Sequence, residues 1–116
     1  MKTVDIKYII IGIALLLFVS CGQQQQAKSV VKDFVAQQLK KEVSYLEFSD
    51  VDSTRAINDS LVNVMRQKGP QGVRYQEKNN KTLLHVRAKY VLGNDTCSAT
   101  FYLNPEATGV IAFKEN

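Results

Sequence analysis

The two cysteines and the one histidine are the side chains of this 116-residue chain best suited to chemistry. A cysteine thiol becomes a strong nucleophile where a base or a positive charge stands beside it. Neither group adjoins Cys97 in the sequence. His85 has no carboxylate partner along the chain, and a lone histidine makes neither a metal site nor an acid–base pair. The sequence therefore predicts no catalytic residue, no metal site and no cofactor.

Asp50, Asp52 and Thr54 have the spacing of the first half of a calcium-binding loop. The glycine and the terminal glutamate that such a loop needs are absent. We therefore interpret residues 49–54 as a solvated loop, in which Asp52 and Ser53 are candidates to cap the helix that follows.

Cys21 differs from Cys97 in what precedes it. Lys2 and Lys7 lead into the uncharged apolar run Tyr8 to Val19, which is long enough for the apolar region of a signal peptide but shorter than the ~20 residues of a membrane-spanning helix. The sequence Phe18-Val19-Ser20-Cys21 resembles the lipobox of bacterial lipoproteins, with phenylalanine in place of the usual leucine. The resemblance implies cleavage before Cys21 and attachment of lipid to its thiol. An uncleaved anchor, the alternative, does not account for the polar tract that follows.

The chain accordingly divides into three parts. Residues 1–20 are the predicted signal peptide, residues 21–26 the lipid attachment site and a flexible glutamine-rich tether, and residues 27–116 a single domain. Loss of residues 1–20 leaves 13 basic and 10 acidic residues, a net charge of +3. No basic run indicates nucleic acid. With Cys21 acylated, Cys97 is alone, so no intramolecular disulfide is expected.

Two amphipathic helices are predicted. The first runs from about residue 27 to 41 and the second from about residue 55 to 68, where Gly69-Pro70 ends it. Apolar residues at spacings of three and four form one stripe on each helix. The stripes are Ala27, Val30, Val31, Phe34, Val35 and Leu39 on the first, and Ile57, Leu61, Val64 and Met65 on the second.

The C-terminal half contains two hairpin signals, Asn79-Asn80 and Gly93-Asn94. Turns there, and a further one at residues 104–109, fix a register in which apolar residues share one face. The inward pairs are Tyr90–Cys97, Ala88–Ala99, Val86–Phe101, Leu84–Leu103, Tyr75–Leu84, Val73–Val86, Val110–Leu103 and Ala112–Phe101. Residues 43–48 are expected to form an edge strand or an irregular segment. The predicted fold is α+β: an N-terminal helix and a short second helix packed on a four- to five-stranded antiparallel β-meander.

The outer face of this sheet is the predicted partner-binding surface. It places an apolar and aromatic patch inside a basic rim, a composition typical of interfaces. Its members are Arg74, Leu83, His85, Arg87, Tyr102, Ile111 and Phe113. The second helix also has an apolar stripe to bury, and the alternative is that this helix, or the segment around Tyr45, covers the patch.

The leading helix, the segment SYLEFSDVDS and the stretch LLHVRAKYVLGNDTCSATFYLNPEATGV together resemble small lipoproteins of Bacteroidetes. The resemblance implies a helix with a curved antiparallel sheet of the cystatin-like or NTF2-like kind, and it carries no catalytic residue. It also implies O-glycosylation signals at Ser53 and Ser60. The glutamines after Cys21, where surface-exported members have acidic residues, imply attachment facing the periplasm.

Two functions remain open from the sequence. The first is a lipid-anchored binding or assembly module of the cell envelope that contacts a protein partner through its sheet face. The second is a carrier, or a weak enzyme, that holds a small ligand between the helices and the sheet, in a pocket lined by Tyr75, Tyr90 and Phe101. The sequence does not indicate the oligomeric state.

Overall fold

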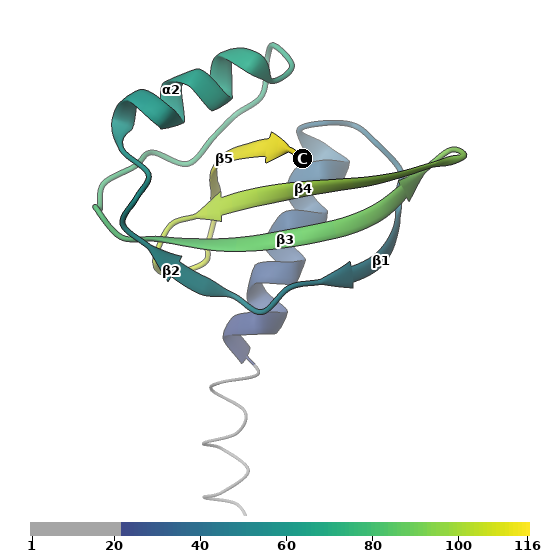
Figure 1. Cartoon of the computed structure of the whole chain (residues 1–116), viewed down its shortest axis with the longest axis horizontal. Helices are drawn as coiled ribbons and strands as arrows, with labels where there is room; N and C mark the ends of the chain where they lie inside the picture. Colours follow the sequence, from purple (N-terminus) through teal and green to yellow (C-terminus); the bar gives the residue numbers. More distant parts are fainter. Residues whose placement is uncertain (1–21) are drawn as a thin grey trace, which may run out of the picture.

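The computed structural model describes residues 22–116, which form two helices on a five-stranded antiparallel sheet (Figure 1). This confirms the predicted α+β fold. An N-terminal helix, helical over residues 22–37, precedes all the strands. The other elements are β1 (Ser44–Phe48), β2 (Asp52–Thr54), α2 (Asp59–Lys68), β3 (Leu83–Leu92), β4 (Asp95–Leu103) and β5 (Val110–Glu115).

The β3–β4 hairpin has the predicted register. Gly93 turns the chain with φ +64°, a backbone angle that glycine adopts without strain. Tyr90 then lies opposite Cys97, Val86 opposite Phe101, and His85 opposite Tyr102. Side chains alternate between the two faces of a strand, so this one turn sorts all the residues of β3 and β4 into an inner and an outer face.

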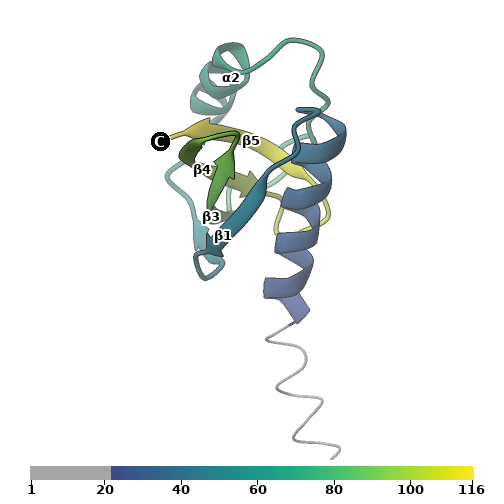
Figure 2. The same cartoon turned by 90° about the vertical axis from the view of Figure 1, so that its right-hand side faces the viewer.

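The N-terminal helix covers the inner face of the sheet (Figure 2). Its predicted stripe is the buried one, and Ala27 and Val31 are fully inaccessible. Phe34 lies at the centre of this layer: its ring centroid is 5.6 Å from that of Phe113 and 6.2 Å from that of Phe101. Packing against the sheet explains how a helix rich in β-branched valine is stable, because burial outweighs propensity.

The predicted Asn79-Asn80 hairpin is wrong. Residues 73–82 form no strand, and β3 pairs on that side with β1 and β2 instead. Tyr75 still reaches the inner core, with its ring 5.7 Å from Phe34, and Gln76 N–H donates to Val110 O. The segment therefore buries its apolar side chains without joining β3, whose free edge residues 44–54 already occupy.

β5 is displaced by one residue from the predicted register. A β-bulge between Tyr102 and Leu103 leaves Val110 opposite Leu103 as expected, but places Ala112 opposite Tyr102 and Phe113 opposite Phe101. An extra residue in one strand exchanges the faces of all the residues beyond it. Phe113 consequently points into the inner core, and Ala112 to the outer face.

The first residues of the described chain are helical, although residues 22–26 were predicted to be a flexible tether. Gln24 fixes them to the domain: its amide donates to Ser49 O and accepts from Val51 N–H, both at 2.9 Å. Gln26 donates to Glu106 O at 3.3 Å. These bonds to two separate loops hold the helix from its first described turn.

Candidate functional site

The position of α2 decides which part of the outer sheet face is accessible. Asn58 caps the helix, its side-chain oxygen accepting from Leu61 N–H at 2.9 Å, and Gly69 N–H closes the other end on Met65 O. The cap lies later in the chain than the predicted candidates Asp52 and Ser53, which are strand residues of β2. A helix of ten residues results, too short to cover the whole face.

α2 covers the apolar part of the predicted partner-binding surface, which was an alternative considered from the sequence. Leu83, Tyr102 and Ile111 are buried, and together with Val62 and Ala112 they form a second hydrophobic core. These side chains therefore stabilise the contact between α2 and the sheet, and of the three predicted members only Tyr102 also lines a groove beside α2.

Two other predicted members of that surface lie away from it. Phe113 lies in the inner core because of the bulge. Arg74 lies outside the sheet, where its backbone N–H donates to the Gln38 side chain, so it does not flank His85. Arg87 is exposed and His85 half-buried on the part of the face that α2 leaves open. Of the predicted surface, His85, Arg87 and Tyr102 remain together, with the His85 and Tyr102 ring centroids 6.4 Å apart.

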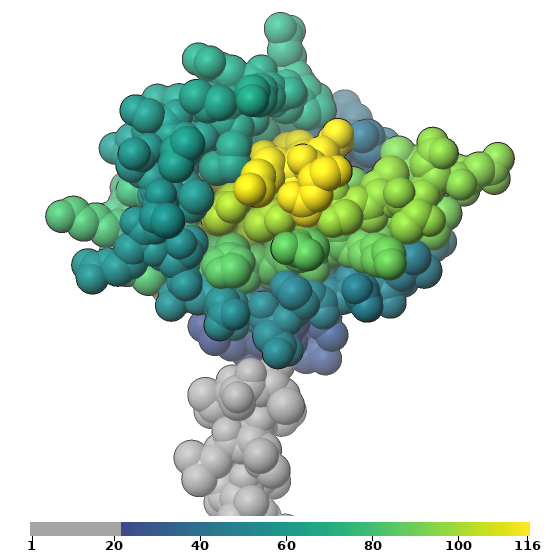
Figure 3. Space-filling view, viewed as in Figure 1, coloured from purple at the N-terminus to yellow at the C-terminus, as the bar shows by residue number. Residues whose placement is uncertain are grey.

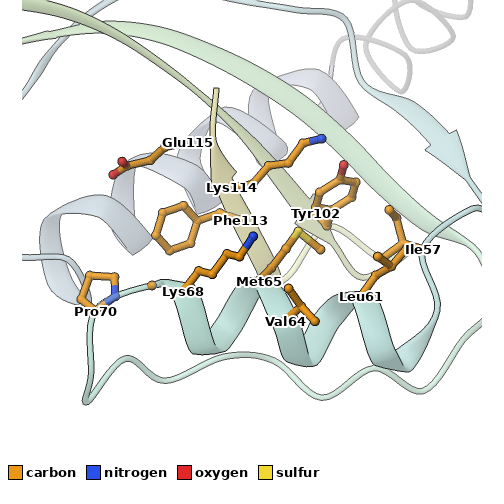
Figure 4. A pocket seen from close by; sticks show the side chains of 11 residues that line it. Ile57, Leu61, Val64, Met65, Lys68, Pro70, Tyr102, Phe113, Lys114 and Glu115 are labelled. Atoms are coloured by element: carbon orange, nitrogen blue, oxygen red, sulfur yellow. The ribbon is translucent and has the colours of Figure 1, made fainter.

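An apolar groove lies between α2 and β5, with a volume of about 770 Å³ (Figure 4). Ile57, Leu61, Val64 and Met65 line its helix side, and Tyr102 its floor. Leu61 and Val64 are 43% and 44% exposed, a high value for such side chains. In the space-filling view β5 reaches the surface directly beside α2 (Figure 3). The groove was not predicted, because the sequence placed Leu61 and Val64 on a buried stripe.

Charged groups surround this groove. Lys68, Lys114 and Glu115 all contribute to its lining. In residues 22–116 the only ion pair joins Lys78 to Asp59, so these three side chains have no charged partner there. With Lys68 and Lys114 against Glu115, the rim is positive by one charge.

A second hollow, of about 500 Å³, lies on the polar remainder of the outer face. Asp52 stands directly opposite His85 in the β2–β3 register, a carboxylate neighbour that the sequence did not indicate. No hydrogen bond or ion pair joins the two side chains among the described residues. Without that contact a histidine and an aspartate do not form an acid–base pair.

The predicted ligand pocket is not one cavity in the described residues: Tyr75 lines a hollow of about 300 Å³ and Tyr90 a separate one of about 480 Å³. Phe101 and Phe113 stack at 5.7 Å, and Phe34 and the N-terminal helix fill the space above them. Burial raises the pKa of Tyr75 and of Tyr90, the other two residues of the predicted lining. Aromatic rings therefore fill the centre of the predicted pocket, and the hypothesis of a ligand carrier or weak enzyme stays a prediction.

The remaining predicted sites lie apart from the groove. Cys97 is half-buried opposite Tyr90 and packs against the inner core, as expected of a small apolar side chain. Ser53 and Ser60 are both exposed. Within residues 22–116 no cluster of three metal-ligating side chains occurs, and no helix has the length and apolar character to cross a bilayer. The predicted signal peptide and Cys21 lie outside the described residues.

Comparisons of the chain with protein-family models, with curated proteins and with solved structures found no match.

Proposed function

We propose that this chain is a lipid-anchored binding module of a bacterial envelope, and that its groove between α2 and β5 holds an apolar segment of a partner protein. The observation that carries the proposal is the exposure of Leu61 and Val64, at 43% and 44%, along one wall of that groove. The sequence supports the anchor, through the lipobox-like segment that ends in Cys21 and the resemblance to Bacteroidetes lipoproteins.

The groove has the properties of a binding site. Its volume of about 770 Å³ lies within the range of roughly 300–1,000 Å³ that ligand sites occupy. Single exposed apolar side chains are ordinary on protein surfaces, but here several line one hollow. Burying them on association is favourable by about 25 cal/mol per Å² of apolar surface.

The charges at the rim favour a protein segment that carries acid. Lys68 and Lys114 outnumber Glu115, and both lysines lack a charged partner in the described chain. An apolar segment with an acidic flank would bury its side chains against α2 and neutralise this excess. Complementary potentials of this kind also accelerate association.

α2 and β5, which line the groove, lie at the end of the domain opposite the start of the N-terminal helix (Figure 1). A lipid on Cys21 would therefore hold the groove on the side that faces away from the membrane. Confinement to the membrane raises the effective concentration of the module toward partners at the same surface.

The anchor is tested by growing cells with a clickable palmitate and comparing the wild-type chain with Cys21→Ser. Label is expected on the wild type only. Equal labelling of both would overturn the anchor, while leaving the groove unaffected.

The groove is tested in cells with a photo-reactive amino acid in place of Val64, and in a control chain in place of Leu46. Leu46 is equally apolar and 55% exposed, but it lies on β1. We expect an adduct from position 64 alone, mapped by mass spectrometry to an apolar segment with acidic residues. The substitution Leu61→Gln should abolish the adduct. Adducts from both positions, or one that ignores Leu61→Gln, would contradict the proposal.

A further inference from the structure

The exposed edge of β5 has two parts that differ in how their backbone groups are satisfied. Near its start, Gln76 N–H donates to Val110 O at 2.8 Å, and Arg66 Nε donates to Ile111 O at 2.9 Å. Arg66 is held in place by a second bond, from Nη2 to Gln76 O, and by the Tyr75 ring 5.1 Å away. This part of the edge is closed to other strands.

The last part of the edge is open. Antiparallel strands direct the backbone groups of alternate residues toward the partner strand and away from it. Asn116 N–H donates to Ser98 O, toward β4, and Arg66 reaches Ile111 O from the opposite side. Residues 112, 114 and 116 therefore face β4, whereas 111, 113 and 115 face outward. No hydrogen bond among the described residues uses the outward backbone groups of Phe113 and Glu115.

These outward groups meet the apolar groove. Phe113, Lys114 and Glu115 all contribute to its lining, with the end of α2 and Pro70 on the other side. Figure 4 shows β5 between two sets of side chains, Phe113 and Glu115 on one side and Lys114 and Tyr102 on the other. An unpaired strand edge beside an apolar hollow is the arrangement that accepts an added strand.

Resting on the proposed function, we infer that the partner segment binds in extended form and adds to β5 as a further strand of the sheet. Its backbone pairs with Phe113 and Glu115. Alternate side chains enter the hollow lined by Leu61, Val64 and Met65, and an acidic residue meets Lys68 or Lys114. Backbone pairing supplies affinity, and the apolar hollow selects the side chains.

A second copy of this chain fits the edge less well. Two β5 edges paired around a twofold axis would bring the same rim to face itself, and each rim has an excess of positive charge. The mature chain also has a predicted net charge of +3. Like charges facing each other oppose association, so the charge favours a different, acidic partner.

The experiment uses the full chain, purified from membranes in detergent, and a displayed library of random dodecapeptides as the probe. Selected peptides are measured on the wild type, on Glu115→Pro and on Glu115→Gln. Proline at an outward-facing edge position removes one N–H without breaking the β4–β5 ladder. The matched Glu115→Gln removes the charge and keeps the N–H. Hydrogen exchange of each β5 amide is followed with and without peptide.

Relative to Glu115→Gln, Glu115→Pro should weaken binding by on the order of tenfold, the effect of one lost hydrogen bond. Glu115→Gln itself should bind acidic peptides at least as tightly as the wild type, because it removes the one negative charge of the rim. The amides of Phe113 and Glu115 should become protected on binding, while those of Ala112 and Lys114 are protected throughout. The selected peptides should combine alternating apolar residues with acid.

Three results would overturn part of the scheme, and each is distinct. Peptides that need Leu61 and Val64 but tolerate Glu115→Pro, without protection at 113 and 115, would remove strand addition and keep the groove. Peptides that bind equally to Leu61→Gln/Val64→Gln would remove the proposed function. Protection at 113 and 115 that rises with protein concentration alone would replace the acidic partner by a second copy.

Discussion

The two helices of this protein carry similar apolar stripes and bury them to very different extents. The N-terminal helix has Ala27 and Val31 fully inaccessible and Phe34 and Val35 nearly so. On α2 only Val62 is buried, while Leu61 and Val64 remain exposed. The first helix uses its whole stripe to stabilise the fold. The contact between α2 and the sheet leaves part of the apolar surface of α2 exposed. This exposed surface makes α2 the better candidate for binding a partner.

The faces beneath the helices differ in the same way. Under the N-terminal helix the sheet presents aromatic rings that pack on one another, with Phe34 contacting both Phe101 and Phe113. Under α2 the core is a small cluster around Val62, Tyr102 and Ile111. Protein interiors are close-packed, so substitutions in the inner face should mainly affect the stability of the fold. Substitutions in the outer face should mainly affect the binding of a partner.

The largest effect is expected from Phe34→Ala. Removal of a buried aromatic ring costs about 3–5 kcal/mol through lost burial and the cavity left behind. Urea denaturation followed by circular dichroism measures the change in the free energy of unfolding. A loss below about 1 kcal/mol would break the comparison, since it would mean that the inner face tolerates a cavity at its centre.

Val62→Ala should have a smaller effect on the same measurement. Two methylene equivalents are lost from a side chain that is 2% exposed, which corresponds to about 1–2 kcal/mol. The cost should fall mainly on α2, whose amides should exchange faster while those of β3 and β4 stay protected. Equal destabilisation by Val62→Ala and Phe34→Ala would show that the two faces contribute alike.

Alkaline pH should weaken the inner face. Burial raises the pKa of Tyr45, Tyr75 and Tyr90 above the ordinary value of 10.0. Nearby Tyr90 raises the pKa of Tyr45 further, and Cys97 and Glu115 raise that of Tyr90 further. The positive charge of Arg66 acts in the opposite direction and lowers the pKa of Tyr75. The folded chain then holds these protons more tightly than the unfolded one, so the stabilisation is complete below about pH 10 and is lost as the pH rises through the raised values. Unfolding at pH 8 to 11, compared with the ultraviolet titration of tyrosine, measures this. Constant stability across that range would contradict it.

The smallest change in stability is expected from the pair Leu61→Gln and Val64→Gln. Both positions are exposed and glutamine is a good helix former, so the free energy of unfolding should change by no more than about 0.5 kcal/mol. Partner binding should nevertheless be lost, whereas Leu46→Gln should retain it. A double variant that unfolds readily would show that these side chains are structural.

The register of β3 and β4 was predictable because one glycine turn separates two strands of clear alternation, from Leu84–Leu103 to Tyr90–Cys97. The same reasoning failed at Asn79-Asn80, since a turn-prone pair does not reveal that β3 is already paired with β1 and β2. Residues 43–48 were predicted to be an edge strand or an irregular segment, and they form the edge strand β1, whose bulge between Tyr45 and Glu47 breaks its alternation.

The groove could not be predicted for a similar reason. The stripe through Leu61 and Val64 was correctly recognised as apolar, but which side of it meets the sheet depends on how α2 is rotated. In the structure the α2 residue buried against the sheet is Val62, which lies outside the predicted stripe and packs with Tyr102 and Ile111. Periodicity identifies an amphipathic helix without giving the fraction of its apolar side that a neighbour covers.

Gln24 limits the distance between the domain and the proposed lipid anchor at Cys21. Its two hydrogen bonds, to Ser49 and Val51, tie the chain to the domain three residues after Cys21. A lipid on Cys21 would then be joined to the domain by a linker of only a few residues, which would restrict the movement of the domain relative to the membrane. The helix of residues 22–37 is about 24 Å long at 1.5 Å per residue, and α2 lies at the end of the domain opposite its start (Figure 1). With the proposed lipid on Cys21, a partner segment held away from the bilayer surface would reach the groove more readily than one lying among the lipid headgroups.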